Sequence, residues 1–466
     1  MPGVLPDTAS VSQNGRLSLG GCDVADLADR FGTPLIVFDR ATFEARASFF
    51  ASVLAPERVF YAGKAFACVA VCELLRELGL GLDVCTGGEL ATASAAGFPA
   101  DRVIFHGNNK SEAELAAARD AGVGRIVIDS FEEMDRLEAT EATARLLIRV
   151  TPGVEAHTHE FVQTGQEDSK FGFGLGDGGA RDGLQRALKI PRCEVVGVHA
   201  HIGSQIFELA AFELTIKRLA AFLAGVHDDL GFTASELNLG GGLGIAHTED
   251  ETTPDVVESV QRMVGAVERE FPSAGLPVPD VFVEPGRSLV GSAAVTVYRV
   301  GTVKQIPGAR TFGAPGGGTG EGRRAVAHEP WRTYVAVDGG MGDNIRPPLY
   351  GAKYECFLAD RVNAPADLRA EVVGKFCESG DYLLRDAHLP HDIARGDLLC
   401  IPATGAYTYS MASNYNRQPR PAVVMVDGGR ATEIIRRETY DDVMRLDRRL
   451  DGSEPGPPTP TERRSV

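Results

Sequence analysis

Short apolar runs alternate with amphipathic stretches over the first two thirds of the chain. The runs are rich in β-branched residues and have the length of buried strands, whereas the stretches between them carry apolar residues at helical spacing. Strands are predicted at 59–61, 80–85, 103–106, 125–129, 146–150, 195–201, 237–239 and 281–284. Helices are predicted at 68–78, 89–96, 112–121, 131–139, 209–230 and 254–270. Capping-box spacing marks the start of three of them, at Thr86 with Glu89, Ser111 with Glu114 and Ser130 with Glu133.

Alternation of strands and helices is typical of βαβ units with a parallel sheet. Eight such strands are the number that closes a (β/α)8 barrel of the TIM type. A doubly wound open sheet is the alternative. The glycine-rich stretch of this chain, however, is not a GxGxxG motif opening the first unit.

The pattern changes after residue 288, where short strands bounded by turn residues replace the alternation. Strands predicted at 295–300, 334–337, 397–401, 422–425 and 433–436 indicate a second, all-β domain. Near the N-terminus, a short helix at 24–31 precedes an apolar run at 34–38. A Gly-rich stretch at 311–324 is interpreted as a flexible insertion, and the Pro-rich, charged end from about residue 447 as a disordered tail.

Composition narrows the choice of partners and compartment. The 466-residue chain has a net charge of -17, which argues against nucleic acid or an anionic membrane as the main partner. No apolar run is long enough to span a bilayer, and the first residues lack the apolar core of a secretion signal. The eight cysteines are scattered without a CxxC pair, which predicts free thiols in a reducing cytoplasm.

Chemistry in a (β/α)8 barrel lies where strands end and loops begin. Polar or glycine-rich segments follow most of the predicted strands: Lys64; Asp83 and Thr86; His106, Asn108 and Asn109; His199 to Ser204; Asn238 to Gly244; Glu284 to Arg287. We therefore expect a lysine, a histidine pair, a glycine cradle and a Glu/Arg pair at one barrel mouth. Burial would lower the pKa of Lys64 and allow its amine to attack a carbonyl, although a solvated lysine at a strand end is the simpler interpretation of that stretch alone.

The glycine run 240–242 would let backbone N–H groups approach a phosphate, and Ser204 and the Gly286–Arg287 turn strengthen that interpretation. His199 and His201 share one face of their strand, so a zinc-dependent amidohydrolase is a rival. In that chemistry HxH usually lies on the first strand and an aspartate ends the last, whereas here these strands end in lysine and glutamate. His157 and His159 lie in a long loop, 153–179, that we interpret as a lid.

An imine-forming lysine, a phosphate cradle, a flat stacking partner in His201 and an acid together indicate pyridoxal 5′-phosphate. A carboxylate opposite the pyridine nitrogen keeps that nitrogen protonated and makes the ring a strong electron sink, whereas a cationic partner would suit racemisation. Glu284 is the candidate carboxylate and favours decarboxylation. A structural salt bridge between Glu284 and Arg287 is the alternative.

Ordered motifs from residue 34 to residue 442 resemble those of diaminopimelate decarboxylase, a fold type III pyridoxal-phosphate family that acts last in lysine biosynthesis. The motifs are FYAGKA, DVCTGGEL, HGNNKS, HTHEFVQTG with SKFG, HAHIGSQ, LNLGGGLGI, EPGRSLV, VDGGMGDNIRPPLY, CESGD and GAYTYSMASNYN. The resemblance implies that the N-terminal strand joins the β domain. It also implies a head-to-tail homodimer in which Cys377 and Glu378 reach the partner's barrel.

The resemblance assigns roles to residues at this mouth. The cofactor-binding set is Lys64, Asp83, His201, Ser204, Gly242, Glu284, Gly286, Arg287 and Tyr407. The substrate-binding set is Arg287, Arg346, Tyr350, Glu378 and Tyr407. Cys377 is the expected proton donor beside Lys64, and no metal is expected. Two guanidiniums suit a distal carboxylate and one glutamate suits a distal ammonium, so meso-diaminopimelate is the expected substrate and L-lysine the product.

Two alternatives stay open: a related decarboxylase for ornithine, arginine or a carboxylated polyamine, and a non-catalytic pyridoxal-phosphate-binding homologue. Non-catalytic carriers of this kind lack the β domain, and inactive paralogues usually lose the lysine or the cysteine. The expected domains are an N-terminal segment at 1–40, the barrel at 41–288, the β domain at 289–446 and the tail at 447–466.

Overall fold

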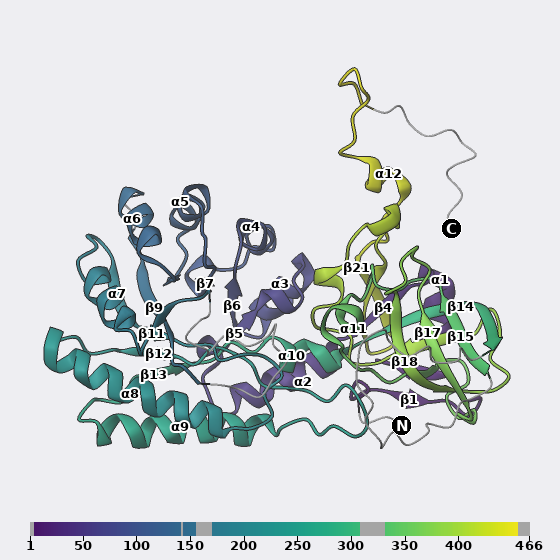
Figure 1. Ribbon diagram of the computed structural model, residues 1–466, viewed down its shortest axis with the longest axis horizontal. Helices are drawn as coiled ribbons and strands as arrows, with labels where there is room; N and C mark the ends of the chain where they lie inside the picture. The colour runs from purple at the N-terminus through teal and green to yellow at the C-terminus, as the bar shows by residue number, and fades with distance from the viewer. Residues whose placement is uncertain (1–3, 141–142, 155–169, 308–330, 455–466) are drawn as a thin grey trace, which may run out of the picture.

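The computed structural model describes residues 4–140, 143–154, 170–307 and 331–454. A helix-bearing barrel and a β domain lie side by side (Figure 1). The histidines at 157 and 159, most of the predicted lid, the insertion at 311–324 and the end of the tail at 455–466 lie outside the described residues. Across the described residues, no helix combines the length and apolar character needed to cross a membrane.

The barrel is a parallel sheet of eight neighbouring strands in this described part of the chain. They are β5 (Phe60–Ala62), β6 (Gly81–Val84), β7 (Val103–Phe105), β8 (Arg125–Ile128), β9 (Arg145–Thr151), β11 (Glu194–His199), β12 (Glu236–Asn238) and β13 (Asp280–Phe282). The first and last close on each other through a parallel bridge between Val59 and Val283, where Phe60 N–H donates to Val283 O at 2.9 Å. The predicted barrel is confirmed, and the open sheet is excluded.

Helices cover the outside of the barrel in the order that the sequence pattern predicts (Figure 1). They are α3 (Val69–Glu77), α4 (Gly87–Ala95), α5 (Glu112–Ala121), α6 (Phe131–Ala139), α7 (Gly179–Ala187), α8 (Ala210–Leu230) and α9 (Val256–Ser273), with α2 (Arg40–Ala51) leading into the first strand. Ser111 and Glu114 form a complete capping box. Ser130 caps α6 in the same way, but the Glu133 side chain turns inward to Lys110 instead. The prediction missed α2, α7 and the short β10 (Phe173–Gly174).

The second domain is a mixed β structure that the N-terminal part of the chain completes. The run predicted at 34–38 is β4 (Leu35–Asp39), which pairs antiparallel with β14 (Ala294–Pro307) and parallel with β20 (Ala422–Asp427). The resemblance implied this pairing, and the structure confirms it. Because β4 lies between two strands that follow the barrel in sequence, the barrel is inserted within the β domain.

The remaining strands of this sheet are β15 (Trp331–Val337), β16 (Phe357–Leu358), β17 (Leu368–Val373), β18 (Tyr382–Leu389), β19 (Leu398–Ile401) and β21 (Arg430–Ile435). The prediction missed β16, β17 and β18. A small sheet of β1 (Ser10–Val11), β2 (Leu17–Leu19) and β3 (Cys22–Asp23) precedes α1 (Val24–Phe31). The short helices α10 (Arg287–Val290), α11 (Arg346–Tyr350) and α12 (Tyr440–Met444) complete the chain.

Candidate active site

Lys64 lies on a single 3-10 turn, Gly63–Ala65, directly after β5. Contacts on both sides fix this turn. The Tyr61 hydroxyl donates to the Phe66 carbonyl at 2.8 Å, and the Ala65 carbonyl accepts the backbone N–H of Tyr407 at 2.8 Å. Tyr407 belongs to the β domain, so both domains meet at the backbone that carries the lysine.

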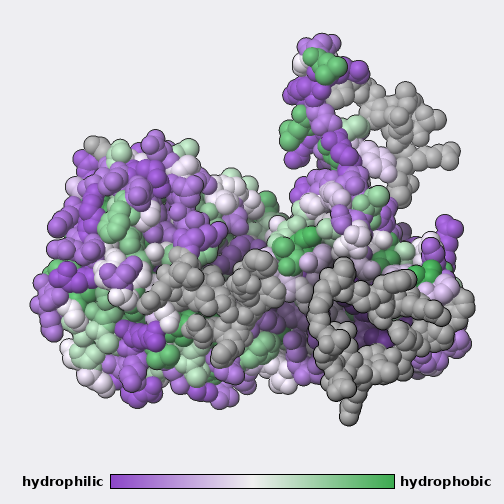
Figure 2. All heavy atoms as spheres, in the orientation of Figure 1, coloured by the Kyte–Doolittle hydropathy of each residue, from purple (hydrophilic) through white to green (hydrophobic). Residues whose placement is uncertain are grey.

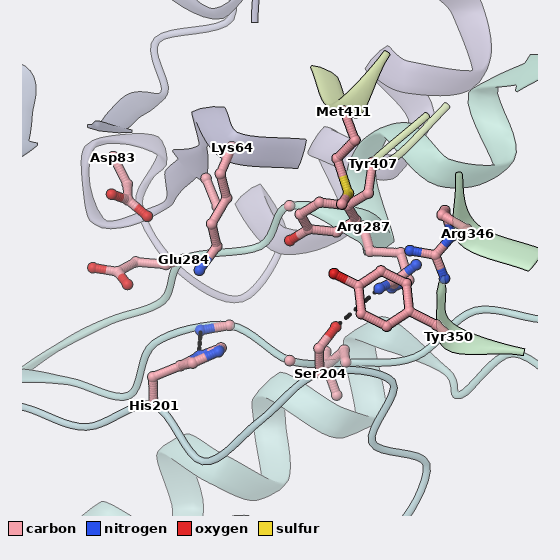
Figure 3. A pocket seen from close by; sticks show the side chains of 15 residues that line it. Lys64, Asp83, His201, Ser204, Glu284, Arg287, Arg346, Tyr350, Tyr407 and Met411 are labelled. Carbon is pink, nitrogen blue, oxygen red and sulfur yellow. Dashed lines mark hydrogen bonds between the residues drawn. The ribbon is translucent and has the colours of Figure 1, made fainter. Parts of the chain in front are cut away.

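A cavity of about 190 Å³ opens in front of Lys64 (Figure 3). It brings together most of the residues that the sequence predicted: Lys64, Asp83, His201, Ser204, Gly242, Glu284, Gly286, Arg287, Arg346, Tyr350 and Tyr407. They come from the ends of five barrel strands and from two segments of the β domain. Only tertiary structure can gather residues so far apart in the chain.

One side of the cavity is a cradle of backbone. A Cβ atom at Gly241 would meet Glu284 O at 2.1 Å, and one at Gly242 would meet Gly203 O at 2.4 Å, so no larger residue fits either position. Gly242 also has a φ of 119°, which favours glycine. Arg287 Nη2 donates to Ser204 Oγ at 3.1 Å, while its Nε and Nη1 are buried without a hydrogen-bond partner within the described residues. Unsatisfied guanidinium donors beside a glycine cradle suit an anion such as a phosphate.

His201 lies across the cavity from Lys64 in Figure 3. Its Nδ1 accepts the backbone N–H of Gly241 at 3.3 Å. Burial, together with the charge of Lys64, holds the pKa of His201 well below its ordinary value. The ring is therefore neutral at physiological pH, as a flat stacking partner should be.

Glu284 lies at the opposite end from Arg287, and three side chains hold its carboxylate. His106 Nε2 and Asn238 Nδ2 each lie 2.7 Å from Oε1, and His199 Nε2 lies 3.1 Å from Oε2. Burial opposes the charge of Glu284, but the two histidines outweigh it and hold the pKa well below its ordinary value. The described residues show no Glu284–Arg287 ion pair, so the structural salt bridge is not the role of this glutamate.

Asp83 is a second buried carboxylate at the same end, and its pKa is shifted in the opposite direction from that of Glu284. Burial raises the pKa of Asp83 to about 6, with the negative charge of Glu284 adding to the effect and His106 opposing it. Burial likewise opposes the charge of Lys64, but its interactions with Tyr407, Cys85 and Asp83 raise the pKa of the lysine above its ordinary value. The prediction that burial lowers the pKa of Lys64 is therefore wrong for the cofactor-free site, because acidic neighbours stabilise the ammonium.

Two arginines share the end of the cavity near the β domain. The Arg287 and Arg346 guanidiniums lie 4.8 Å and 5.9 Å from the centre of the Tyr407 ring. Arg346 donates from Nε to the Tyr354 hydroxyl at 2.8 Å, which fixes its orientation. Burial and the charge of Arg346 lower the pKa of Arg287 to about 10. Two buried cations this close require an anionic ligand, so this end suits a carboxylate or phosphate.

Cys377 and Glu378 do not line the cavity. Cys377 is exposed on the loop between β17 and β18, where its backbone N–H donates to Asn416 Oδ1 at 2.9 Å. Asp381 holds this loop by accepting N–H groups from Met341 at 2.7 Å and Phe376 at 2.9 Å. The same aspartate thus ties the Cys377 loop to the segment that leads to Arg346.

Sequence reasoning assigned no role to Met411, which lines the cavity, or to His106, Asn238, Tyr354 and Asp381. His106 and Asn238 gave a signal because each lies at a barrel strand end. Tyr354 and Asp381 carry no sequence signal except that they lie near or within recognisable motifs, because each acts through a contact with another segment.

The zinc interpretation of His199 and His201 meets a different geometry. Within the described residues, the grouping that offers metal-type ligands is His106, His199 and Glu284, and His201 is not part of it. The separations of 2.7 Å and 3.1 Å within this group are those of hydrogen bonds. In both contacts the histidine Nε2 is already hydrogen-bonded to the Glu284 carboxylate, so the site does not support zinc hydrolysis.

Comparison with known proteins assigns the family. The model of the pyridoxal-dependent decarboxylase, pyridoxal binding domain, matches residues 40–291. The diaminopimelate decarboxylase of Bacillus subtilis is 46% identical over 95% of this chain and 98% of its own length. The chain belongs to the diaminopimelate decarboxylase family. A relative of the same name from Mycobacterium tuberculosis is 43% identical over 96% of this chain and 98% of its own length.

Solved structures of the family have the same architecture. Diaminopimelate decarboxylase from M. jannaschii, in complex with L-lysine, superposes with a TM-score of 0.84 at 30% identity and covers 95% of this chain and 98% of its own. The Helicobacter pylori enzyme with L-lysine gives 0.78 at 28% identity, covering 91% and 98%. A lysine/ornithine decarboxylase from Vibrio vulnificus, at 20% identity and a TM-score of 0.71, shares the fold.

The residues present fit the pyridoxal phosphate on which this family depends. The unsatisfied Arg287 donors and the glycine cradle match a phosphate, the neutral His201 ring matches a stacking partner, and the ionised Glu284 matches a protonated pyridine nitrogen. Lys64 between them is placed to bind the cofactor's aldehyde carbon.

Proposed function

We propose that this protein removes one carboxyl group from meso-2,6-diaminopimelate, releasing CO2 and L-lysine, as the last step of lysine biosynthesis. The observation that carries the proposal is the single cavity in which Lys64, the phosphate-type cradle and Glu284 share space with Arg287 and Arg346. The names of the relatives and solved structures support the same reaction.

The cofactor-side residues have separate tasks in this proposal. Lys64 would hold the cofactor covalently, and His201 would stack on its ring. Ser204, Gly242, Gly286 and Arg287 hold the phosphate, with Tyr407 and Asp83 beside them. When bound, pyridoxal phosphate would supply the electron sink that the loss of CO2 requires. As an anion, Glu284 would keep the ring nitrogen protonated, and a protonated ring is a stronger electron sink.

The distal end of the substrate decides specificity. Diaminopimelate has a carboxylate and an ammonium at the end that does not react, and the two arginines with Tyr350 suit that carboxylate. Ornithine has only an ammonium there, which would meet buried guanidiniums with like charge. A site built to bind a polar group can reject a substrate that lacks this group by a factor of about 10⁴. This argument favours diaminopimelate over ornithine, arginine and carboxylated polyamines.

We further propose a head-to-tail homodimer in which Cys377 and Glu378 complete the partner's cavity. Cys377 Sγ would then deliver a proton to the carbon that has lost CO2, and Glu378 would meet the distal ammonium. The support is that both residues lie outside their own chain's cavity, on an exposed loop.

An arm of chain beside that loop strengthens the dimer proposal. From α12 to residue 454, this arm rises away from both domains (Figure 1), and apolar patches interrupt its polar surface (Figure 2). Leu446 and Leu450 on it are 79% and 111% exposed. The lower end of this arm contacts residues 414–417, where Asn416 accepts the backbone N–H of Cys377. Asn414 binds Glu438 there, and Arg417 binds Asp447. In the proposed dimer, the surface around Cys377 that faces the partner would therefore extend onto this arm.

The proposed domain organisation follows the sequence: an N-terminal segment at 1–40, a cofactor-binding barrel at 41–288, a β domain at 289–446 and a terminal tail at 447–466. A cytoplasmic location is proposed because all eight cysteines are free thiols, as expected in a reducing compartment.

The test is an assay of released CO2 from purified protein, loaded with pyridoxal phosphate, against meso-diaminopimelate, ornithine, arginine and lysine. Activity confined to diaminopimelate is expected, and borohydride reduction should fix the cofactor on Lys64, with Lys64→Ala as the unlabelled control. Equal release from ornithine or arginine would contradict the substrate, and a label on another lysine would contradict the site. Cofactor binding without CO2 release from any of these would indicate a non-catalytic homologue.

A further inference from the structure

The carboxylate of Glu284 is held by three N–H donors from three different barrel strand ends. His106 follows β7, His199 ends β11 and Asn238 ends β12. All three are buried, at 4%, 1% and 0% exposure. Three buried polar side chains thus converge on one carboxylate inside the barrel. Contact with a pyridine nitrogen would not by itself require these three donors.

The donors leave a defined share of the carboxylate free. A carboxylate offers about four acceptor positions. His106 and Asn238 occupy two on Oε1, and His199 occupies one on Oε2. About one acceptor position therefore stays available, and it lies on a carboxylate that lines the cavity.

The tautomer of His199 follows from the same contacts. Its Nε2 must carry the proton that it donates to Glu284, while its Nδ1 is buried with no hydrogen-bond partner within the described residues. A doubly protonated ring would leave a buried N–H unsatisfied, and burial lowers the pKa of His199 to about 4. His199 is thus a neutral donor. Together with Asn238, it places two uncharged N–H groups on the carboxylate.

Asn238 also connects this carboxylate to the phosphate side of the cavity. Its Oδ1 accepts the backbone N–H of Gly240 at 2.9 Å while its Nδ2 binds Glu284. The orientation of its amide is therefore fixed, since a flipped amide would lose both bonds. One side chain sets the position of the carboxylate and of the first glycine in the cradle.

The charged and titratable groups that interact with Glu284 come from several strands. They are Asp83 and Cys85 from β6 and the residues after it, His106, Arg149 from β9, His199 and His201. Burial raises the pKa of Asp83 to about 6, whereas the neighbouring histidines hold the pKa of Glu284 well below its ordinary value. Environments that separate the pKa values of two neighbouring carboxyl groups assign them different roles.

We propose that His106, His199 and Asn238 are positioning residues that keep Glu284 ionised and aimed at the pyridine nitrogen of the cofactor, so that this nitrogen stays protonated. This inference rests on the proposed cofactor site but not on the identity of the substrate. The residues act through Glu284 and touch no reacting atom.

The test replaces the donors in matched pairs. His106→Leu and His199→Leu remove the N–H, whereas His106→Gln and His199→Gln keep an amide N–H near the position of Nε2. Asn238→Asp keeps the acceptor for Gly240 and replaces the donor with a second carboxylate. His227→Gln, an exposed histidine on α8 that contacts Thr233, is the control. Each holoenzyme is prepared with pyridoxal phosphate labelled with 15N in the ring.

The primary readout is the 15N chemical shift of the ring nitrogen between pH 6 and 9, because protonation moves this shift strongly. The wild-type and control nitrogens should stay protonated throughout. The Leu and Asp variants should lose the proton within this range and bind the cofactor about 10–100-fold more weakly, the size typical of lost orienting partners. The Gln variants should recover most of both properties.

Wild-type shifts and cofactor affinity in all donor variants would overturn the proposal and leave the three residues a packing role. If the variants do not fold, the wild-type holoenzyme still decides, since a deprotonated ring nitrogen at pH 7 would also overturn it. A protein that shows the expected shifts but releases no CO2 from diaminopimelate would contradict the proposed function alone.

Discussion

Within one chain, the barrel mouth and the loop that carries Cys377 differ in how complete they are. At the mouth, Lys64 is fixed by contacts from both domains, and Glu284 has three hydrogen-bonding partners. Cys377 is exposed, and its backbone N–H donates to Asn416 Oδ1 at 2.9 Å. One chain therefore supplies the residues on the cofactor side, whereas the proposed proton donor is exposed outside the cavity of its own chain.

The largest expected effect tests this division directly. Lys64→Ala should abolish activity and Cys377→Ala should leave about a hundredth of it or less, because each removes one half of a composite site. Mixing the two inactive proteins should restore about a quarter of the wild-type activity per total site, since random exchange gives half mixed dimers with one intact site each. CO2 release after mixing measures it. No recovery despite proven subunit exchange would show that each chain builds its own site.

A second, smaller effect separates chemistry from binding. Cys377→Ala alone should lower kcat by about 10²–10⁴-fold, the range of a lost general acid, while cofactor affinity stays at the wild-type value. Cofactor titration and steady-state kinetics measure the two properties. Ser379→Ala, an exposed residue on the same loop, is the control. A Cys377 variant that loses cofactor binding would contradict the outward role of this loop.

At the arginine end the expected loss is in substrate affinity. Arg346→Ala should raise the KM for diaminopimelate about 10–100-fold, because it removes hydrogen bonds to a charged group, and the cofactor should stay bound. Tyr354→Phe keeps the guanidinium but loses the bond that orients it, so a smaller rise is expected. Steady-state kinetics at fixed cofactor saturation check both. Equal effects on ornithine and diaminopimelate would remove Arg346 from the specificity argument.

The smallest effect concerns the seam between the two domains, where the His247 ring packs edge-on against Tyr354 at 5.3 Å. Burial, aided by Arg287 and Arg346, lowers the pKa of His247 to about 3. The unfolded histidine protonates first as the pH falls, so this residue's contribution to stability is present above pH 6.5 and is lost between 6.5 and 3.

His247→Gln should therefore make the unfolding free energy of the cofactor-free protein fall less steeply with acid, by up to about 1.4 kcal/mol per pH unit. Denaturant titrations at pH 7, 6 and 5 measure the slope, with His227→Gln as the exposed control. An unchanged slope would mean that His247 is protonated in the folded protein.

The sequence by itself determined the local elements and the family. The spacing of apolar residues and the capping residues predicted α5 and α6 with their observed bounds. Each predicted barrel strand lies within a few residues of an observed one. Runs of β-branched residues buried on both faces carry a strong local signal. β17 and β18 were missed because half-exposed strands, with burial alternating along the chain, carry a weaker one.

Tertiary structure alone decided which side chains act together. The Glu284 carboxylate meets His106 across 178 positions of the chain, and Ala65 meets Ser410 across 345. No local period encodes such contacts. The pKa of Lys64 was decided in the same way, because Tyr407, Cys85 and Asp83 come from other segments and reverse the shift that burial alone would cause. A strand end shows which residue types face the mouth, but the protonation of each depends on all the strands that surround it.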